Sequence, residues 1–267
     1  MDIKEFLDQD EIKDLIAAGD LEAVYKRYAP NNYLSDYLLN LGINPIDYFT
    51  DSIPDDAFHY CTSLTSVNIP DNITSIDQSA FQNSSLTRIV IPDSVTTIGD
   101  CAFYNCTSLT SVTFGENSQL TSIGSLAFSR CTSLTSITIP DSITKIGGWA
   151  FADCKSLTSI DVPSSVTEIK VGAFNNCDSL TSITIPDSVP EIINELFNGC
   201  EKLTSVRIGS GVTRIGVGAF RYCKSLTDIN YDGTQAEWRK IKQDRRWRHE
   251  SPIQVIHCID GDILLKS

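Results

Sequence analysis

Short runs of alternating apolar and polar residues recur along most of the chain. In one such run, the apolar residues Leu134, Ile137 and Ile139 are separated by small polar residues. Alternation of this kind, with a period of two, is typical of a short strand that buries one face. Pro140 ends the strand because it cannot donate a ladder hydrogen bond, and Asp141 suits the turn that follows. The pattern predicts a half-buried strand followed by a turn.

This run belongs to an internal repeat, A-F-x-x-C-x-S-L-T-S-I-x-I-P-D-S-V-T-x-I-G, which recurs about every 23 residues. The spacings between successive Phe positions are 23, 22, 25, 23, 23, 23 and 23. The short spacing lies at FQNSSL, where Ser84 or a gap replaces the usual Cys, and the long one comes from GENSQL at 115–120. The Phe positions are Phe58, Phe81, Phe103, Phe128, Phe151, Phe174, Phe197 and Phe220.

Each repeat is expected to form one coil of a solenoid. After the strand, Ile143 and Ile146 return to the core, Gly147 supports a bend, and Ala150 with Phe151 fills the convex side. One coil cannot bury these residues alone, whereas stacked coils share a continuous core and pair their strands into a parallel sheet. With strands about 4.8 Å apart, eight coils would give a sheet on the order of 35 Å long.

The repeated Phe, Cys, Leu, Ile and Pro positions resemble those of the BspA-like leucine-rich repeat family, whose unit is commonly A-F-x-x-C-x-x-L-x-x-I-x-I-P. The resemblance covers about residues 53–231. It implies an α/β repeat fold: a right-handed leucine-rich-repeat solenoid with its parallel β-sheet on the concave face. It also implies a bacterial protein with an adhesion-type role at a cell surface, as is common in that family.

Residues 1–52 precede the repeats and are predicted to form a helical N-terminal cap. An apolar stripe at helical spacing predicts a helix over residues 3–16, and Asp20 suits the start of a second. A third is expected from about Asn32 to Leu41, with Gly42 as its stop, and residues 44–45 open a short fourth turn. The alternative is a helical partner-binding module, favoured by the many Tyr and a charge of −8 over residues 1–55.

Residues 232–267 break the repeat phase and are predicted to form an irregular C-terminal cap. We expect a short helix over 236–241 and a strand over 254–259 that turns at 260–261 into a last strand at 263–265. Trp238 and Trp247 are expected to cover the last coil. The segment 238–249 also holds six basic residues, which favours a solvated face; single-stranded nucleic acid or an acidic partner is the alternative.

The charge of the whole chain is −13, which disfavours nucleic acid and anionic membranes as partners. No stretch approaches the roughly 20 apolar residues of a membrane span, so we expect no membrane insertion. The N-terminus lacks the basic start and apolar core of a secretory signal. The sequence alone therefore predicts a cytoplasmic protein or one whose export signal has been removed, whereas the family resemblance favours the cell surface.

Seven of the nine cysteines follow the repeat and are predicted to be buried free thiols. A zinc site needs ligands that converge on one point, whereas residues one coil apart lie on a line about 5 Å from each neighbour. Disulfides prefer Cβ atoms about 3.8 Å apart, so neighbours in register are poorly placed for them. The seven are Cys61, Cys106, Cys131, Cys154, Cys177, Cys200 and Cys223, with Cys101 and Cys258 outside the row.

We expect no catalytic, cofactor-binding or metal-binding residues. The sequence contains no G-x-S-x-G, H-E-x-x-H, phosphate-cradling or dinucleotide-binding motif. An Asp recurs after the strand Pro, but acid–base catalysis needs two carboxylates in different environments, and a ladder places them in similar ones. The prediction is a protein that is not an enzyme and uses no cofactor.

The strand positions that face away from the core are the candidate contact residues. Most are Ser or Thr, and this monotony is broken by two basic and two acidic residues. The alternative is that Ser and Thr simply suit a solvated strand face. The predicted ligand-contact residues are Arg88, Ser136, Thr138, Asp161, Thr184, Arg207 and Asp228.

The sequence thus predicts a non-catalytic protein-interaction or adhesion-type module that presents the solenoid surface to a protein or a glycan. A structural spacer repeat without a dedicated ligand and a carbohydrate-binding module are the alternatives. Exposed aromatics on the strand face would favour the carbohydrate alternative, and none stands at those positions. The ligand and the oligomeric state are left open.

Overall fold

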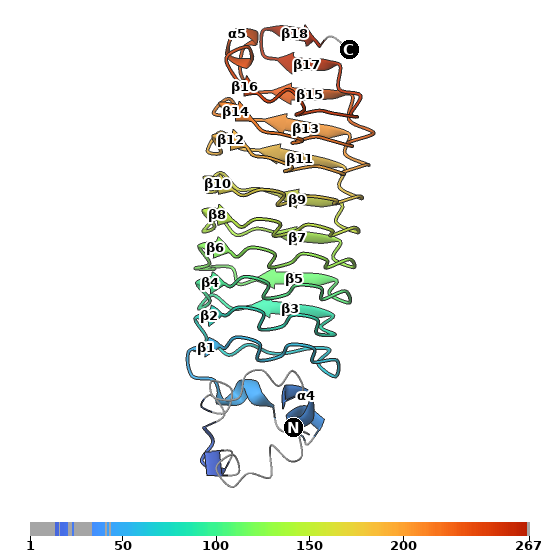
Figure 1. Cartoon of the computed structure of the whole chain (residues 1–267). Helices are drawn as coiled ribbons and strands as arrows, with labels where there is room; N and C mark the ends of the chain where they lie inside the picture. Colours follow the sequence, from blue (N-terminus) through green and yellow to red (C-terminus); the bar gives the residue numbers. More distant parts are fainter. Residues whose placement is uncertain are drawn as a thin grey trace.

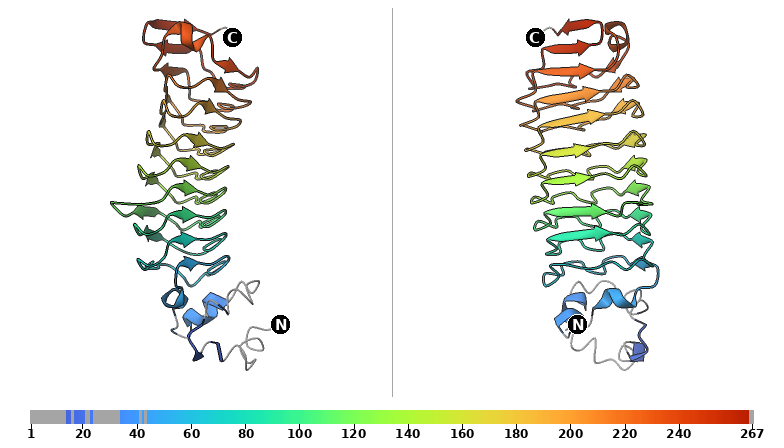
Figure 2. Two further views of the ribbon diagram at one scale, coloured as in Figure 1. Left: turned by 90° about the vertical axis from the view of Figure 1, so that its left-hand side faces the viewer. Right: turned by 180° about the vertical axis from the view of Figure 1, so that it is seen from behind.

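A computed structural model describes residues 14–15, 17–20, 23, 34–40, 42 and 44–265. From β1 onward, the chain winds into an elongated column of stacked turns (Figure 1). From β2 onward, each turn contributes one two-residue strand and one longer strand, which lie on different sides of the column (Figure 2); in the first turn the longer strand is reduced to a bridge between Asn68 and Val90. The predicted parallel β-solenoid is therefore confirmed, while its right-handed sense and the concavity of its sheet stay predictions.

The longer strands form a nine-stranded sheet, which we call the long-strand sheet. Its first eight strands are parallel, and the last pairs antiparallel with its neighbour. Pairing keeps the repeat in phase, so that Ser136 lies opposite Ser159 and Ile137 opposite Ile160. In spatial order the strands are β3 (Arg88–Ile91), β5 (Ser111–Phe114), β7 (Ser136–Thr138), β9 (Ser159–Asp161), β11 (Ser182–Ile185), β13 (Ser205–Ile208), β15 (Asp228–Tyr231), β17 (Val255–Cys258) and β18 (Gly261–Leu264).

A second set of strands, two residues each, was not expected from the sequence because so short a run has no readable alternation. They form a six-stranded and a three-stranded parallel sheet. The first holds β1 (Ser52–Ile53), β2 (Ser75–Ile76), β4 (Thr97–Ile98), β6 (Ser122–Ile123), β8 (Lys145–Ile146) and β10 (Glu168–Ile169). The second holds β12 (Glu191–Ile192), β14 (Arg214–Ile215) and β16 (Lys242–Gln243).

Pro190 explains why the short strands divide between β10 and β12. In the preceding turns, the Thr144 and Thr167 backbone N–H groups each donate to the turn before, at 2.9 Å. Pro190 occupies the corresponding place and has no N–H to donate. The ladder is therefore interrupted at this turn and resumes with the next.

The predicted Phe residues form one column through the core. All eight are fully buried, and neighbouring rings stack with centroids 5.0–5.8 Å apart and planes within 22° of parallel. This separation matches the spacing of paired strands, so ring stacking and strand pairing are satisfied together. The column confirms that the repeated apolar residues form one shared core.

The α/β part of the predicted fold class is wrong for the repeats, because residues 53–231 contain no helix. The segment around each Phe is a series of turns instead. Around Phe151, both Trp149 and Asp153 have left-handed backbone conformations, with φ values of 51° and 58°. A residue in this conformation cannot continue a right-handed helix. The backbone instead bonds between turns, as where the Phe151 N–H donates to the Ala173 carbonyl at 2.9 Å.

The C-terminal segment is more regular than the irregular cap that we expected. After the helix α5 (Gln235–Trp238), β16 pairs with β14 and β17 pairs with β15, so the segment completes a further turn. The expected hairpin is present as β17–β18. Ser251 occupies the Cys position of this turn: its hydroxyl donates to the Phe220 carbonyl, just as the Cys223 thiol of the turn before donates to the Phe197 carbonyl. The sequence did not reveal this further turn, because Arg248 occupies the position that Phe occupies in the other repeats.

The N-terminal region is described in part. The predicted third helix is present as α4 (Leu34–Asn40), and the predicted fourth turn is a 3-10 helix, η1 (Pro45–Tyr48). Phe49 packs edge-on against Phe58 with ring centroids 6.2 Å apart. The first two predicted helices fall largely outside the described residues.

Candidate binding face

The outward side chains of the long-strand sheet form a largely polar surface, which we call the open face. Along each strand, buried and outward residues alternate, as in β11, where Ser182 and Thr184 are exposed while Ile183 and Ile185 are buried. The sheet pairing aligns the outward residues of successive turns into rows. The rows are spaced by about 4.8 Å, the distance between paired strands.

Three of the predicted contact residues meet on this face. Thr184 lies opposite Arg207 in the sheet, and Asp161 lies level with Thr184, two residues beyond the Ser159–Ser182 pair. Together with the Ser residues beside them, they line a shallow depression of about 340 Å³. Thr138 adjoins the depression, because it pairs with Asp161.

The charged groups of this depression differ in their partners. The Arg207 Nε donates to an Asp232 oxygen at 2.8 Å, and this hydrogen bond raises the pKa of the guanidinium. Among the residues that the structure describes, none forms a hydrogen bond or an ion pair with the Asp161 carboxylate. Asp161 therefore presents an unneutralised charge to anything that covers the face.

The other predicted residues are not among those that line this depression. Arg88 is exposed on β3, three strands before β9, so roughly 14 Å of sheet separates it from Asp161. Ser136 is exposed on β7. Asp228 is half-buried on β15, where it accepts a hydrogen bond from the Thr227 hydroxyl at 2.8 Å.

The sequence reasoning missed the continuation of the same row into the C-terminal turn. Asn230 lies opposite Arg207, and His257 lies opposite Asn230. The His257 Nδ1 is 2.8 Å from an Asp262 oxygen, and its Nε2 is 3.8 Å from an Asp228 oxygen. Recognising residues 255–258 as a strand in phase with the repeats would have placed His257 on this face.

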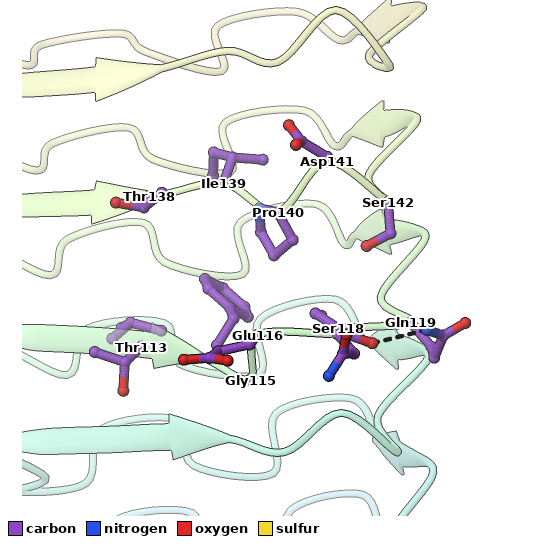
Figure 3. Close-up of a pocket in the computed structure, with 13 residues that line it drawn as sticks. Thr113, Gly115, Glu116, Ser118, Gln119, Thr138, Ile139, Pro140, Asp141 and Ser142 are labelled. Carbon is purple, nitrogen blue, oxygen red and sulfur yellow. Dashed lines mark hydrogen bonds between the residues drawn. The ribbon is translucent and has the colours of Figure 1, made fainter.

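A second depression lies beside the long repeat, where the loop after β5 projects beyond the neighbouring turns (Figure 2). It has a volume of about 560 Å³ and lies between the loop 115–119 and the turn 138–142 of the next repeat (Figure 3). Thr113 and Thr138 of the open face also line it. We call this depression the loop pocket; it was not predicted from the sequence.

The seven repeat cysteines are free and buried, as predicted. Six of the thiols donate to the carbonyl of the Phe one turn earlier, as from Cys154 to Phe128 at 3.1 Å and from Cys200 to Phe174 at 3.1 Å, whereas the Cys61 thiol donates to an Asp36 carboxylate oxygen at 3.0 Å. Burial raises the pKa of Cys154 to about 12 and that of Cys106 to about 11. The row is thus a set of neutral hydrogen-bonded thiols that link adjacent turns.

Two absences hold for the part of the chain that the structure describes. No three His, Cys, Asp or Glu side chains are grouped so that they could hold a metal ion. No helix there is both long and apolar enough to span a bilayer.

The family model of the BspA type leucine rich repeat region matches the chain over residues 43–157 and 121–242, in six copies. The chain belongs to the BspA-type leucine-rich repeat family. This confirms the resemblance carried by the repeated Phe, Cys, Leu, Ile and Pro positions. No functionally curated protein shows a significant match to the chain.

Two crystal structures similar to this BspA-type chain come from bacteria. A leucine rich cell surface protein from Faecalibacterium prausnitzii A2-165 is 33% identical, with a TM-score of 0.51, and the match covers 73% of this chain and 60% of that one. The T. pallidum leucine rich repeat protein is 28% identical, with a TM-score of 0.56, and the match covers 72% and 86%. The chain thus spans 60% of the length of its F. prausnitzii relative.

Proposed function

We propose that this BspA-type protein is a non-catalytic binding module that recognises a protein partner through the open face. The observation that carries the proposal is the unneutralised Asp161 carboxylate in a depression that is otherwise lined mainly by Ser and Thr, with Arg207 and Asn230 at one side. A charge that the described part of the chain leaves unpaired is available to a partner, and charged groups on a preformed surface give specificity at low ordering cost.

The spacing of the charged side chains suits a large partner better than a small one. Arg88 and Asp161 lie three strands apart, and Arg207 lies two strands beyond Asp161. Contacts spread over five strand spacings, on the order of 24 Å, are within reach of a protein surface and beyond a small molecule. The three residues would set specificity, and the Ser and Thr rows would contribute hydrogen bonds.

The two ends of the solenoid would then cover its first and last turns and would not bind the partner themselves. We propose that residues 1–52 close the first turn, that 53–231 carry the repeats, and that 232–267 close the last turn. Contacts of α4 and η1 with the first turn support the first assignment: Ser35 donates to the Ala57 carbonyl, and Leu38 and Ile46 are buried. A location of this protein at the cell surface is favoured by the F. prausnitzii relative, which is described as a cell surface protein.

The decisive experiment is a pull-down from host surface extract and lysate with Arg88→Ala, Asp161→Ala and Arg207→Ala combined. We expect the triple variant to lose the captured partner while its melting temperature changes little, because exposed charges contribute little to stability. Partner capture unchanged by the triple variant would remove the open face as the binding surface.

A matched control removes two basic residues and one acidic residue from the short-strand side: Lys145→Ala, Glu168→Ala and Arg214→Ala, all on short strands. This variant has the same net charge as the first and is expected to retain binding. A glycan array with the wild-type protein tests the carbohydrate alternative. If the wild-type protein binds a glycan and the three open-face substitutions abolish that binding, the ligand of the open face is a glycan and not a protein.

A further inference from the structure

The loop pocket exists because one repeat is two residues longer than most of its neighbours. The Phe103 to Phe128 spacing is 25 residues, and the extra residues fall in the loop around Glu116 and Asn117. In repeat proteins, insertions map to loops on one face, which is often the binding face. The insertion therefore marks this turn as different from the others.

The loop is held to the turn before it. The Gly115 N–H donates to the Ile91 carbonyl at 3.0 Å, and the Asn117 N–H donates to an Asp93 carboxylate oxygen at 3.0 Å. The Gln119 N–H donates to the Asp93 carbonyl at 3.3 Å. Three hydrogen bonds thus draw the loop away from the turn that follows.

The next turn does not close over the loop. Strands β3 and β5 pair through four residues as far as Ile91 and Phe114, whereas β5 and β7 pair only through two, ending at Val112 and Ile137. Pro140 stands where Gly115 stands one turn earlier, and it has no N–H to donate to the Phe114 carbonyl. Beyond Val112 the two turns diverge, and the pocket opens between them.

The lining of the pocket combines an aromatic ring with a carboxylate. Where neighbouring turns carry Ile91 and Ile139, this turn carries Phe114, and its ring is only partly buried. Glu116, an exposed residue of the inserted loop, lines the pocket beside it. Asp141 also lines the pocket, but Figure 3 shows its carboxylate directed away from the loop, so Glu116 is the acidic residue on the loop side of the pocket.

The rest of the lining is also rich in hydrogen-bond acceptors. It includes Thr113, Thr138 and Gln119, and none of the lining residues is basic. A planar guanidinium can stack on an aromatic ring while its N–H groups bind a carboxylate and neighbouring oxygens. A lysine ammonium can meet the carboxylate but cannot use the ring plane in the same way.

We propose that the loop pocket receives an arginine side chain of the protein partner, with Phe114 as the stacking platform and Glu116 as the counter-charge. The proposal rests on the proposed function, because the partner that covers the open face would supply the arginine. Thr113 and Thr138 belong to both surfaces, so a partner seated on the face reaches the pocket without a gap. The volume of about 560 Å³ accommodates an arginine side chain together with adjoining backbone.

The test uses a small probe in place of the unidentified partner. N-acetyl-arginine amide is titrated into the isotope-labelled full chain and followed by backbone amide NMR signals, with N-acetyl-citrulline amide as its neutral analogue of the same shape. We expect the arginine probe to shift the signals of Gly115, Glu116 and Gln119, with weak, millimolar binding. The citrulline probe is expected to bind at least about threefold more weakly, since it lacks the charge.

Two substitutions test the stacking role of Phe114 and the counter-charge role of Glu116 separately. Phe114→Ile restores the residue type of neighbouring turns and is expected to weaken arginine binding by about three- to tenfold, as is Glu116→Gln. Deletion of residues 116–117 restores the 23-residue spacing and is expected to remove binding. The control Glu201→Gln changes an exposed carboxylate four repeats later and leaves the probe affinity unchanged.

The pocket assignment is overturned if the arginine probe shifts no loop signals at tens of millimolar, or if citrulline binds equally well. Binding that survives both Phe114→Ile and Glu116→Gln has the same consequence. These outcomes are independent of the pull-down, since the probe contains no partner. Loss of capture in the Arg88, Asp161 and Arg207 variant with no probe binding would keep the binding face and remove only the arginine pocket.

Discussion

The Trp247 indole meets the Phe220 ring at an interplanar angle of 81°, with ring centroids 5.8 Å apart. The Phe220 N–H also donates to the Trp247 carbonyl at 2.8 Å. Trp247 is largely buried and contacts Trp238, whose ring centroid is 6.4 Å away. The expected covering of the last repeat by both Trp residues is confirmed, and Trp247 ends the Phe column.

Trp247→Ala is expected to lower the free energy of unfolding by about 3 to 5 kcal/mol, because it leaves a cavity against the last Phe ring. Urea unfolding followed by circular dichroism measures the loss. Trp247→Phe keeps an aromatic ring at this place and should retain most of the stability. A loss below about 1 kcal/mol for the alanine variant would mean that Trp247 does not hold the last turn in place.

Gly147→Ala is expected to destabilise the column by about 1 to 3 kcal/mol through overpacking. A Cβ atom on Gly147 would lie 2.5 Å from backbone atoms of Gly124 and Ser125 in the preceding turn, so the two turns would have to separate. The neighbouring residue offers the matched control, since a Cβ atom on Gly148 would make its nearest contact, with Val171, at 3.5 Å. Gly148→Ala should be neutral or slightly stabilising, and equal effects of the two variants would contradict the argument.

The buried thiols predict a loss of stability at alkaline pH. Burial raises the pKa of Cys154 to about 12, whereas the thiol of an unfolded chain has its ordinary value near 9. Between these values the unfolded chain binds fewer protons than the folded one, so stability falls as pH rises above about 9. Each such thiol contributes up to about 1.4 kcal/mol per pH unit over that interval.

Cys154→Ser isolates this effect, because a serine hydroxyl does not ionise in the same range. Ser251 already makes the equivalent bond to the Phe220 carbonyl, so the substitution has a precedent within the chain. Unfolding measured from pH 8 to 11 should show a shallower decline for the variant. Identical slopes for variant and wild type would show that Cys154 ionises alike in both states.

Thiol titration tests the same burial at constant pH. In native protein at pH 8, the half-buried Cys101 and Cys258 are expected to react first with a thiol reagent, and the repeat cysteines only after unfolding. Rapid reaction of more than two cysteines in the folded protein would contradict the conclusion that the repeat cysteines are buried, neutral thiols.

We expect the packing of α4 against the first turn to depend on pH through the Asp36 carboxylate. Burial raises the pKa of Asp36, but hydrogen bonds from Ser63, Cys61 and Thr62 outweigh burial and leave the pKa below its usual value. The stabilising contribution is therefore present above the usual pKa of an aspartate and is lost as pH falls through the lowered value. Amide exchange of residues 34–40 should become several-fold faster in Asp36→Asn, while Asp71→Asn, an exposed turn residue, should leave it unchanged.

What the sequence determined by itself is the repeating core. The positions of Phe151, Cys154 and Leu157 follow from the period alone, because an apolar residue that returns once per turn can be buried only if successive turns stack. The row of outward Ser and Thr residues followed from the same alternation. The contact residues predicted on that row are placed by the structure on the expected face, and their role in binding stays a prediction.

Tertiary structure decided whatever depends on contacts between turns. The paired short strands have no local signal, because they arise from hydrogen bonds to a residue about 23 positions away. The insertion at 115–120 was visible in the sequence, but the pocket beside it depends on how the loop bonds to the turn before and diverges from the turn after. The C-terminal turn was hidden for the same reason: Arg248 and Ser251 do not match the repeat letters, but backbone pairing with the turn before places them in its register. Whether a residue is buried follows from its apolar or polar type, which the sequence shows. The register of the strands and the space between turns depend on hydrogen bonds and packing between neighbouring turns, which the sequence does not show.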